Sequence, residues 1–393
     1  MSTPPAPTPL HLLRSHSSAI TALACSSDNE RIYSADASGK VVITSTRSLR
    51  AIAAWNAHTD SILGVEEWNQ FIVTHGRDNK LHMWQRIEEL PLSARIGGSA
   101  DLLSLPTPTL LCSMDVNALN FCRFSLLQGV DDSRALVAIP NLVDSSTADV
   151  WALPSKDRLH AAIGQEIQKP LFSADPGGRN TSGIVMSMHL YQSVSLNILM
   201  AYENGSVVLR QYTAKDKLVS IEGQGWQIIW SAKIHVESIM AMRVSRANAF
   251  AVTVSADHIV GRYNLTTESL PDSERAVAFR TKHAGNSSIA LRSDGKVCAV
   301  GGWDGKTQLY STKSFKALGI LRYHKSAIHA LEFAHGIAGG GQEADDHTGH
   351  STDVEFDDED ELSSEEKLAR SRWLLSGSKD NRVAIWSLIA FSK

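Results

Sequence analysis

Short apolar runs separated by turn residues cover most of the chain. In several runs apolar and polar positions alternate, as in residues 80–84, and Gly, Asn or Asp stands between runs, as at Asn204 and Gly205. Alternation places successive side chains on opposite faces of a strand, and Asn-Gly is typical of a tight hairpin turn. The pattern therefore predicts short antiparallel strands joined by hairpins throughout.

One motif recurs along these runs: an aspartate followed six positions later by an aromatic residue. Its copies are Asp78 with Trp84, Asp257 with Tyr263, Asp304 with Tyr310, and Asp380 with Trp386. In three copies a hydroxyl residue stands four positions before the aspartate, namely Thr74, Thr253 and Ser376. This spacing is the signature of the WD40 repeat, which predicts a β-propeller.

The spacing of the motif has a mechanical reason. In such a blade the aspartate lies in the hairpin between the second and third strands, the hydroxyl on the second strand, and the tryptophan on the third. A histidine at the start of the blade bridges hydroxyl and aspartate, and each of these buried groups costs about 1–3 kcal/mol if left unpaired. We therefore expect structural hydrogen-bonded sets at His58, Thr74, Asp78 and Trp84; at His235, Thr253, Asp257 and Tyr263; and at His324, Ser376, Asp380 and Trp386.

The chain divides into seven repeats, two of them weak. They cover residues 16–44, 58–84, 116–151, 184–209, 235–263, 283–310 and 324–386, and the third and fourth lack the histidine and the regular aspartate. The last repeat stops on its third strand, so we expect residues 10–13 to supply its outer strand and to close the ring, which removes a free sheet edge. The predicted fold class is all-β, a seven-bladed WD40 β-propeller over residues 10–390, preceded by a flexible Pro-rich segment, residues 1–9.

Composition adds the general class of protein. The chain has 393 residues, 43% hydrophobic and 20% charged, which is ordinary for a soluble globular protein. A repeat architecture accommodates this length because each unit packs only on its neighbours. Neither a secretory signal nor an apolar run of about 18 residues is found. The four cysteines form no CxxC pair and three lie in apolar stretches, so we expect them to be reduced.

An acidic segment interrupts the last repeat between its first and second strands. Residues 343–366 hold twelve acidic residues and no Lys or Arg, and without these acids the formal charge of the chain changes from −4 to +8. We predict a disordered acidic insertion over residues 336–370. It is a solvated loop, a partner-binding segment or a cover for a basic face of the ring. Ser363 and Ser364 are candidate sites for acidophilic kinases, and His347 and His350 lack the preformed geometry of a metal site.

Positions beside the hairpin aspartates are the best candidates for partner binding. Such residues surround the mouth of a propeller's central channel, and here they are Arg77, Trp303 and Lys379. Exposed Trp and Arg are favoured anchors at protein interfaces. Trp303 follows a glycine pair and precedes Gly305, so we expect it to be exposed, with packing on the neighbouring blade as the alternative.

No motif for catalysis, a cofactor or a metal is found. The chain lacks GxGxxG before a helix, a Walker loop, HExxH and GxSxG. Structural hydrogen bonds account for His16, His58, His235 and His324 at the blade starts. We therefore expect no enzyme, no cofactor and no small-molecule substrate. Direct DNA binding is disfavoured because no Lys/Arg run with interleaved aromatic residues occurs.

Three segments resemble the ASTRA-associated protein 1 family of fungal WD-repeat proteins, which are related to G-protein β-subunit-like proteins. The segments are residues 114–124, residues 153–160, and the block from 349 to 386. The likeness extends over essentially the whole chain. None of the segments is a catalytic motif, so no active-site residue follows from it.

The resemblance implies a nuclear, non-enzymatic scaffold that belongs to the ASTRA complex. That assembly is linked to chromatin remodelling and to co-chaperones that mature phosphatidylinositol-3-kinase-related kinases, so the implied partners are ASTRA subunits and these co-chaperones. A cytoplasmic G-protein-β-like signalling scaffold is the first alternative, although residues 1–10 are too short and Pro-rich for its N-terminal coiled coil. A ubiquitin-ligase substrate receptor is the second, although the Trp-Asp-x-Arg string of such receptors is missing.

Overall fold

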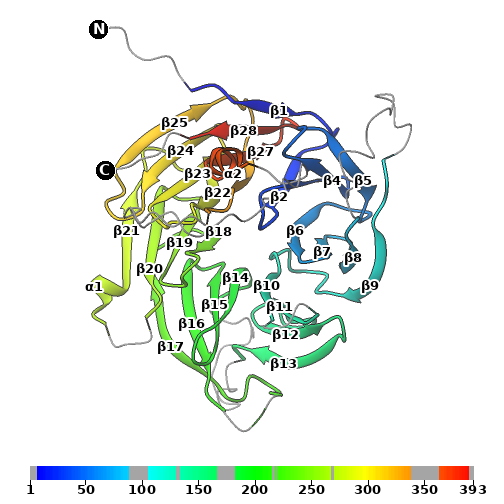
Figure 1. The fold of residues 1–393 in the computed structure, drawn as a ribbon. Coiled ribbons are helices and arrows are strands. Elements are labelled where there is room, and N and C mark those ends of the chain that lie inside the picture. Colours follow the sequence, from blue (N-terminus) through cyan, green and yellow to red (C-terminus); the bar gives the residue numbers. More distant parts are fainter. Residues whose placement is uncertain are drawn as a thin grey trace, which may run out of the picture.

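Seven four-stranded antiparallel sheets are arranged as a ring in the part of the chain that the structure describes (Figure 1). The structure is a computed structural model, and it describes residues 7–87, 105–129, 133–165, 182–214, 217, 219–266, 270–337 and 363–388. The predicted seven-bladed β-propeller is confirmed. No helix in these residues is long and apolar enough to cross a membrane.

The first three blades follow one another along the chain. Blade one contains β2 (Ile20–Cys25), β3 (Arg31–Asp36), β4 (Lys40–Ser45) and β5 (Ala51–Asn56). Blade two contains β6 (Ile62–Trp68), β7 (Phe71–Gly76), β8 (Lys80–Gln85) and β9 (Thr109–Asp115). Blade three contains β10 (Ser125–Gln128), β11 (Ala135–Pro140), β12 (Ala148–Leu153) and β13 (Asp157–Ile163).

The next three blades repeat the same order. Blade four contains β14 (Val185–Gln192), β15 (Leu196–Tyr202), β16 (Ser206–Tyr212) and β17 (Trp226–Lys233). Blade five contains β18 (Ile239–Val244), β19 (Phe250–Ser255), β20 (Ile259–Asn264) and β21 (Ala276–Arg280), with the short helix α1 (Asp272–Arg275) before β21. Blade six contains β22 (Asn286–Leu291), β23 (Val297–Gly302), β24 (Lys306–Ser311) and β25 (Ala317–Arg322).

Blade seven joins the two ends of the chain. It contains β26 (Ile328–Phe333), β27 (Trp373–Ser378) and β28 (Val383–Ser387), and β1 (His11–Leu13) is its outer strand. The register pairs His11 with Ile385 and Leu13 with Val383. The predicted closure by residues 10–13 is therefore confirmed, and Figure 1 shows the blue N-terminal strand beside the red C-terminal one.

The insertion lies between β26 and β27, as expected, but the prediction of disorder over 336–370 is wrong at its C-terminal end. Ser364–Arg370 form the helix α2. A capping box begins it, because Ser363 accepts from the backbone of Glu366 and Glu366 accepts from the backbone of Ser363. Arg370 is buried and donates to the carbonyl of Thr46 on blade one, at 3.5 Å. Residues 338–362 lie outside the described residues.

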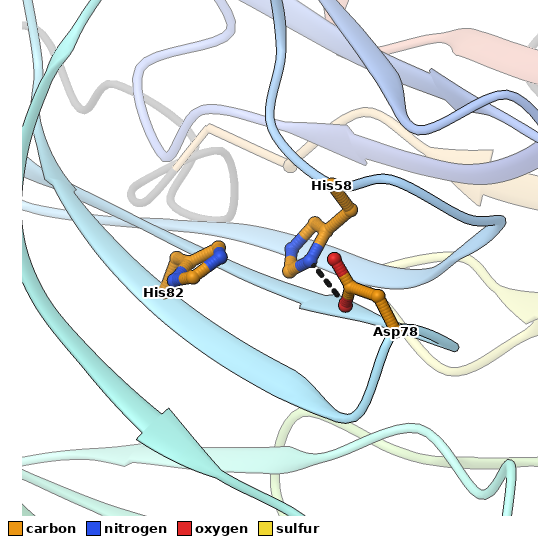
Figure 2. Close-up of side chains that lie close together, drawn as sticks. All are labelled: His58, Asp78 and His82. Atoms are coloured by element: carbon orange, nitrogen blue, oxygen red, sulfur yellow. Dashed lines mark hydrogen bonds and ion pairs between the residues drawn. The ribbon is translucent and has the colours of Figure 1, made fainter.

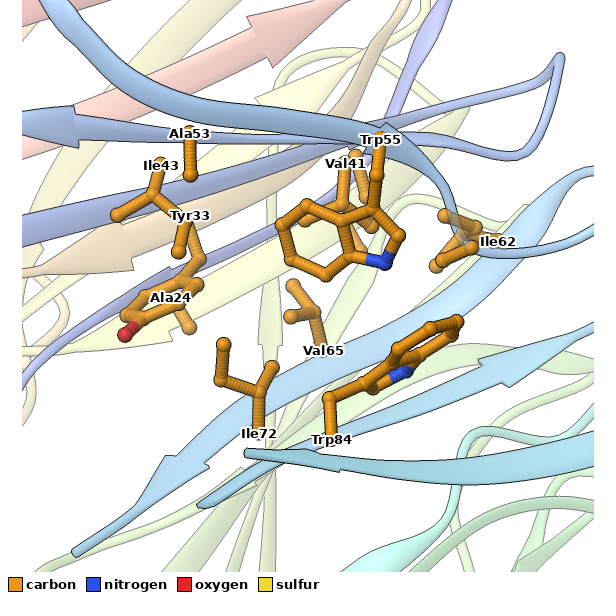
Figure 3. Close-up of a cluster of buried hydrophobic side chains, with 13 residues drawn as sticks. Ala24, Tyr33, Val41, Ile43, Ala53, Trp55, Ile62, Val65, Ile72 and Trp84 are labelled. Carbon is orange, nitrogen blue, oxygen red and sulfur yellow. The ribbon is translucent and has the colours of Figure 1, made fainter. Parts of the chain in front are cut away.

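The apolar core is divided among the junctions between neighbouring blades. Figure 3 shows the cluster between blades one and two, where Trp55 and Trp84 meet edge to face with ring centroids 5.7 Å apart. Tyr33, Val65 and Ile72 complete the contact from both blades. Each such side chain contributes about 1.5–3 kcal/mol when fully buried. Every blade thus depends on its two neighbours, as in other repeat folds.

Blade three lacks the usual polar set and is supported differently. Asn117 donates to the carbonyl of Asn141 at 2.5 Å, and Asn141 donates to the buried carboxylate of Asp149 at 2.9 Å. Arg158 neutralises Asp149 at 2.7 Å. A loop of blade four also pairs with β13 in parallel, because Ser220 exchanges backbone hydrogen bonds with residues 159 and 161.

All seven sheets have the same strand order, so they present the same loops on the same side of the ring. The hairpins between the second and third strands lie together with the connections that lead into the next first strand. We call this side the hairpin face; its hairpins are residues 37–39, 77–79, 141–147, 203–205, 256–258, 303–305 and 379–382. The insertion in blade seven joins a first strand to a second strand, so it leaves from the opposite face.

Three hairpin glycines pack directly on the entry to the next blade. Gly39, Gly205 and Gly305 all have positive φ, near 80–90°. A Cβ on Gly305 would lie 2.5 Å from the carbonyl oxygen of His324, and the other two glycines meet His58 and His235 in the same way. The positive φ and the lack of room for a Cβ therefore both require glycine at these three positions. Each one lies in the hairpin of the blade that precedes a blade with a predicted histidine set.

Replacing Gly305 with alanine tests this packing. We expect Gly305→Ala to lower the free energy of unfolding by about 1–3 kcal/mol, because the new Cβ strains the backbone and displaces the loop that holds His324. Gly319→Ala is the matched control, since nothing lies within 4 Å of its Cβ position. Urea unfolding of both variants measures the difference, and equal stabilities would contradict the proposed contact.

Candidate protein-interaction face

A chain of hydrogen bonds runs through blade two at the hairpin face. The Trp84 indole donates to the Thr74 hydroxyl at 2.9 Å, and the same hydroxyl lies 2.9 Å from Nε2 of His58. Nδ1 of His58 lies 2.8 Å from the carboxylate of Asp78. Asp78 also accepts from the backbone of Thr59 at 3.0 Å, which ties the hairpin to the incoming loop.

The acceptor in this chain determines the tautomer of the histidine. An ionised carboxylate can only accept, so the proton between Asp78 and His58 lies on Nδ1 of His58. In neutral His58, Nε2 is then the acceptor of the Thr74 hydroxyl proton. Burial lowers the pKa of His58, in agreement with the neutral form, and the pKa of Asp78 is lowered by its hydrogen bonds from Thr59 and His58.

Blades seven and five carry the same arrangement. Nδ1 of His324 lies 2.9 Å from Asp380 and Nε2 lies 2.9 Å from the hydroxyl of Ser376. The indole of Trp386 donates to Ser376 at 2.9 Å. In blade five, His235 lies 2.7 Å from Thr253 and 3.1 Å from Asp257. Tyr263, in place of tryptophan, is buried and stacks on Trp230, but its hydroxyl has no hydrogen-bond partner in the described residues, so the predicted set of blade five lacks its aromatic member.

Blade one contains a set that the spacing did not indicate. His16 lies 2.7 Å from Asp36 and 2.8 Å from Ser34. Asp36 lies at the end of β3, two residues after the hydroxyl residue Ser34, whereas in the other sets the aspartate follows the hydroxyl residue by four. Ser38 occupies the usual position of the aspartate and donates to Asp36. These hydrogen bonds lower the pKa of Asp36 to about 2 although burial opposes the shift.

Blade six departs from the pattern. His283 opens its repeat in the sequence but is exposed, and Asp304 is paired with Lys306 at 2.7 Å. Val300 stands where blades one, two, five and seven have a hydroxyl residue, so a histidine here would find no second partner. The hairpin of blade six is consequently held by backbone contacts and carries free polar groups on the surface.

His58, Asp78 and His82 form the one group in the described residues whose side chains are close enough to share a metal ion (Figure 2). His82 stacks on His58 with centroids 4.6 Å apart, and burial lowers the pKa of His82 to about 4. Both nitrogens of His58 are already used, by Thr74 and by Asp78. Coordination of a metal would break the set that holds the blade, so we assign the group to the fold.

The central channel is lined by charges that neutralise one another. Arg123 pairs with Glu66 at 2.7 Å, and Arg243 pairs with Glu332 at 3.4 Å. These residues come from four different blades and border a cavity of about 310 Å³. Each of these two arginines therefore has its own carboxylate inside the ring.

The three predicted partner-binding residues all lie on the hairpin face. Arg77 is exposed and its guanidinium lies 4.0 Å above the ring of Phe121, which is itself exposed. Trp303 is 52% exposed, and one edge of its indole rests on Gly285, where a Cβ would lie 2.7 Å from the ring. Lys379 is exposed and its backbone N–H donates to the carbonyl of Ala327.

Further exposed apolar side chains on this face belong to no repeat motif. They lie in the hairpin of blade three, in the loops that enter blades three and five, and at the start of β18: Leu119, Phe121, Leu142, Val143, Val236 and Met240. Only their place in the ring brings them to one surface, since no sequence spacing relates them. These exposed apolar side chains are available for contacts with other proteins.

Comparison with known proteins identifies the family. The family model described as ASTRA-associated protein 1 matches residues 9–348, and the model described as WD domain, G-beta repeat matches residues 345–387. The chain belongs to the ASTRA-associated protein 1 family. The resemblance seen in the sequence is thereby confirmed, and the family match covers six of the seven blades and the start of the insertion.

Relatives in this family match along nearly their full length. The ASTRA-associated protein 1 of Verticillium alfalfae is 32% identical over 98% of this chain and 94% of its own. That of Schizosaccharomyces pombe is 28% identical over 83% of this chain and 93% of its own. That of Yarrowia lipolytica is 22% identical over 98% of this chain and 95% of its own. The likeness therefore extends over the ring as a whole.

Removing a hairpin carboxylate tests the role of the hydrogen-bonded sets in this family member. Asp380→Ala leaves Nδ1 of the buried His324 without its acceptor, so we expect the free energy of unfolding to fall by about 1–3 kcal/mol. Asp304→Ala removes the same residue type from an exposed hairpin and should change stability by less than about 0.5 kcal/mol. Denaturant unfolding compares them, and similar losses would show that the set contributes nothing.

A buried histidine outside the sets predicts a dependence on pH. His75 is almost fully buried, neither ring nitrogen has a hydrogen-bond partner, and burial lowers its pKa to about 3. The unfolded chain takes up this proton near pH 6.5, whereas the folded chain does not. The stability contributed by neutral His75 is therefore complete above about pH 6.5 and is lost progressively as the pH falls toward 3.

We expect wild-type protein to lose more stability between pH 7.5 and pH 5 than His75→Leu. The difference should be on the order of 2 kcal/mol, because about 1.5 pH units separate pH 5 from the unfolded-state pKa. Urea unfolding at the two pH values measures it. Parallel pH dependences of the two proteins would assign the loss to other groups.

Proposed function

We propose that the protein is a non-enzymatic nuclear scaffold and a subunit of the ASTRA complex, acting in chromatin remodelling and in the maturation of phosphatidylinositol-3-kinase-related kinases. The family match over residues 9–348 carries this proposal, since the relatives are named for their association with ASTRA. The finer roles follow from the resemblance described for the sequence.

The use of polar groups in the ring supports a scaffold. Histidine and aspartate are the residues from which active sites are most often built, yet here the four buried pairs lie in four different sheets. In each pair the histidine nitrogens point at groups of their own blade. The described residues therefore supply a stiff frame, and the exposed side chains of the hairpin face remain for contacts with other proteins.

Affinity purification of the tagged protein followed by mass spectrometry tests the assignment. We expect remodeller subunits or kinase-maturation co-chaperones among the recovered proteins, and a fluorescent fusion should accumulate in the nucleus. A G-protein γ-like subunit would favour the signalling scaffold instead, and cullin adaptors would favour the substrate receptor. Cytoplasmic retention of the fusion would contradict the nuclear role.

The double variant Trp303→Ala with Arg77→Glu tests which face is used. We expect reduced recovery of partners with a nearly unchanged melting temperature, because both side chains are exposed and neither belongs to a buried set. The matched control is Val194→Ala with Arg246→Glu, an exposed apolar and an exposed basic residue from loops of the opposite face. If the two variants recover partners equally well, the hairpin face is not the docking surface.

A further inference from the structure

The hairpin face is divided into regions of opposite charge. Over blades six and seven its described loops carry five basic residues, Lys282, Lys306, Lys325, Lys379 and Arg382, and two carboxylates, Asp304 and Asp380. Both carboxylates are already engaged, Asp304 by Lys306 and Asp380 by His324. The hairpins of blades three and four and the loop entering blade five carry Asp144, Glu203 and Glu237 and no basic residue.

The basic residues lie in loops and hairpins that contact one another and the hairpin of Trp303. The backbone of Trp303 donates to Gly285, three residues after Lys282. Gly305 of the same hairpin packs on the carbonyls on either side of Lys325. We call Lys282, Lys325, Lys379 and Arg382, with Trp303 between them, the basic sector.

The hairpin of blade seven completes the basic sector. The backbone of Lys379 donates to Ala327, and the guanidinium of Arg382 donates to the hydroxyl of Tyr323 at 2.8 Å. Both acceptors belong to the loop that contains Lys325. The three lysines are exposed, and none has a carboxylate partner among the described residues.

Apolar surface adjoins these charges. Trp303 has more than half of its surface free. A cavity of about 180 Å³ lies apart from it in the central channel, where residues of all seven blades line it. Its lining includes Leu63, Met186 and Met240 as well as His329. A cavity of this size accepts a single side chain but is smaller than the pockets that hold small-molecule ligands.

We propose that the basic sector binds an acidic segment of a partner protein, with an aromatic or aliphatic side chain of that segment packed on Trp303. This inference rests on the proposed scaffold function and names the chemistry of one partner. The unpaired ammonium groups attract carboxylates and orient the encounter, while the exposed indole supplies the anchor. Without a partner, the like charges of the sector repel one another.

A nucleic acid fits the surface less well. Its phosphates need a continuous basic track, because affinity grows with the number of phosphates that are neutralised. Here the basic sector spans two blades, and the described hairpins of blades three and four and the loop entering blade five carry carboxylates and no basic residue, at Asp144, Glu203 and Glu237. A long polyanion that crossed the face would be repelled there. A short acidic peptide segment occupies the sector alone.

A charge-reversal experiment with a synthetic probe tests the proposal. The probe is a fluorescein-labelled peptide in which a central Phe-Leu pair is flanked by runs of glutamate, and its binding is measured by fluorescence anisotropy. We expect the triple variant Lys282→Glu, Lys325→Glu, Lys379→Glu to weaken binding by about tenfold or more. Trp303→Ala should weaken it as well. Higher salt should weaken binding to the wild-type protein.

Blade six supplies a matched control on the opposite face. Lys296, Lys313 and Lys316 are exposed there, so Lys296→Glu, Lys313→Glu, Lys316→Glu changes the net charge by the same amount. This variant should bind the probe within about twofold of wild type. Equal losses in the two triple variants, or equal binding of a probe with lysines in place of its glutamates, would overturn the proposal. Tighter binding of labelled duplex DNA, lost in the first variant only, would assign the sector to nucleic acid instead.

Affinity purification with the same variants separates this inference from the proposed function. If wild-type protein recovers ASTRA subunits and the basic-sector variant recovers them equally, the scaffold role stands and the basic sector is not its docking site. If wild-type protein recovers none, the proposed function fails whatever the peptide does. Loss of one subunit in the basic-sector variant only, with unchanged melting temperature, supports both.

Discussion

The hydrogen bond between a histidine at the entry of a blade and the aspartate of that blade's hairpin is the interaction on which the hairpin face depends. It joins a loop to a hairpin some twenty residues away, as in His58 with Asp78 at 2.8 Å. Inside a blade the bond satisfies two polar groups that would be costly to bury alone. Between blades it fixes the entry loop, on which the preceding hairpin packs through a glycine such as Gly39.

Blades without the full set show that the ring tolerates other solutions to the same constraint. In blade one, Asp36 takes the role from a position two residues earlier, and Ser38 fills the usual place. Blade three uses buried asparagines and Asp149. Blade four has Arg210 donating to the hydroxyl of Tyr202 at 3.0 Å. In each of these three blades the buried polar side chain has a hydrogen-bond partner, although a different residue type supplies it.

The division between buried and exposed polar groups gives the ring its functional character. Four buried histidine–aspartate pairs hold hairpins, and two arginines of the channel have their own glutamates. Lysines without a carboxylate partner in the described residues, such as Lys325 and Lys379, lie on the hairpin face together with the exposed Trp303. A frame in which reactive groups are satisfied internally is suited to present a fixed surface to other proteins, and the membership of the ASTRA-associated protein 1 family agrees with that character.

The sequence by itself determined the repeat, the seven blades, the full sets of blades two and seven, and the histidine, hydroxyl and aspartate of the set in blade five. It could do so because strand alternation and the spacing from Thr74 to Asp78 and Trp84 report contacts between strands that are neighbours along the chain. The same reasoning placed Trp303 and Arg77 in hairpin turns. The closing strand at residues 10–13 was also predictable, since a ring of complete sheets leaves one place for it.

Tertiary structure decided the features that depend on residues far apart in sequence. The stacking of Arg77 on Phe121, the packing of Gly305 on His324 and the contact of Lys379 with Ala327 arise only when consecutive blades meet. The irregular position of Asp36 and the capping of α2 by Ser363 and Glu366 are also local adjustments that no repeat period encodes. The basic sector exists for the same reason: its residues share no motif, and the packing of blade six against blade seven brings them together.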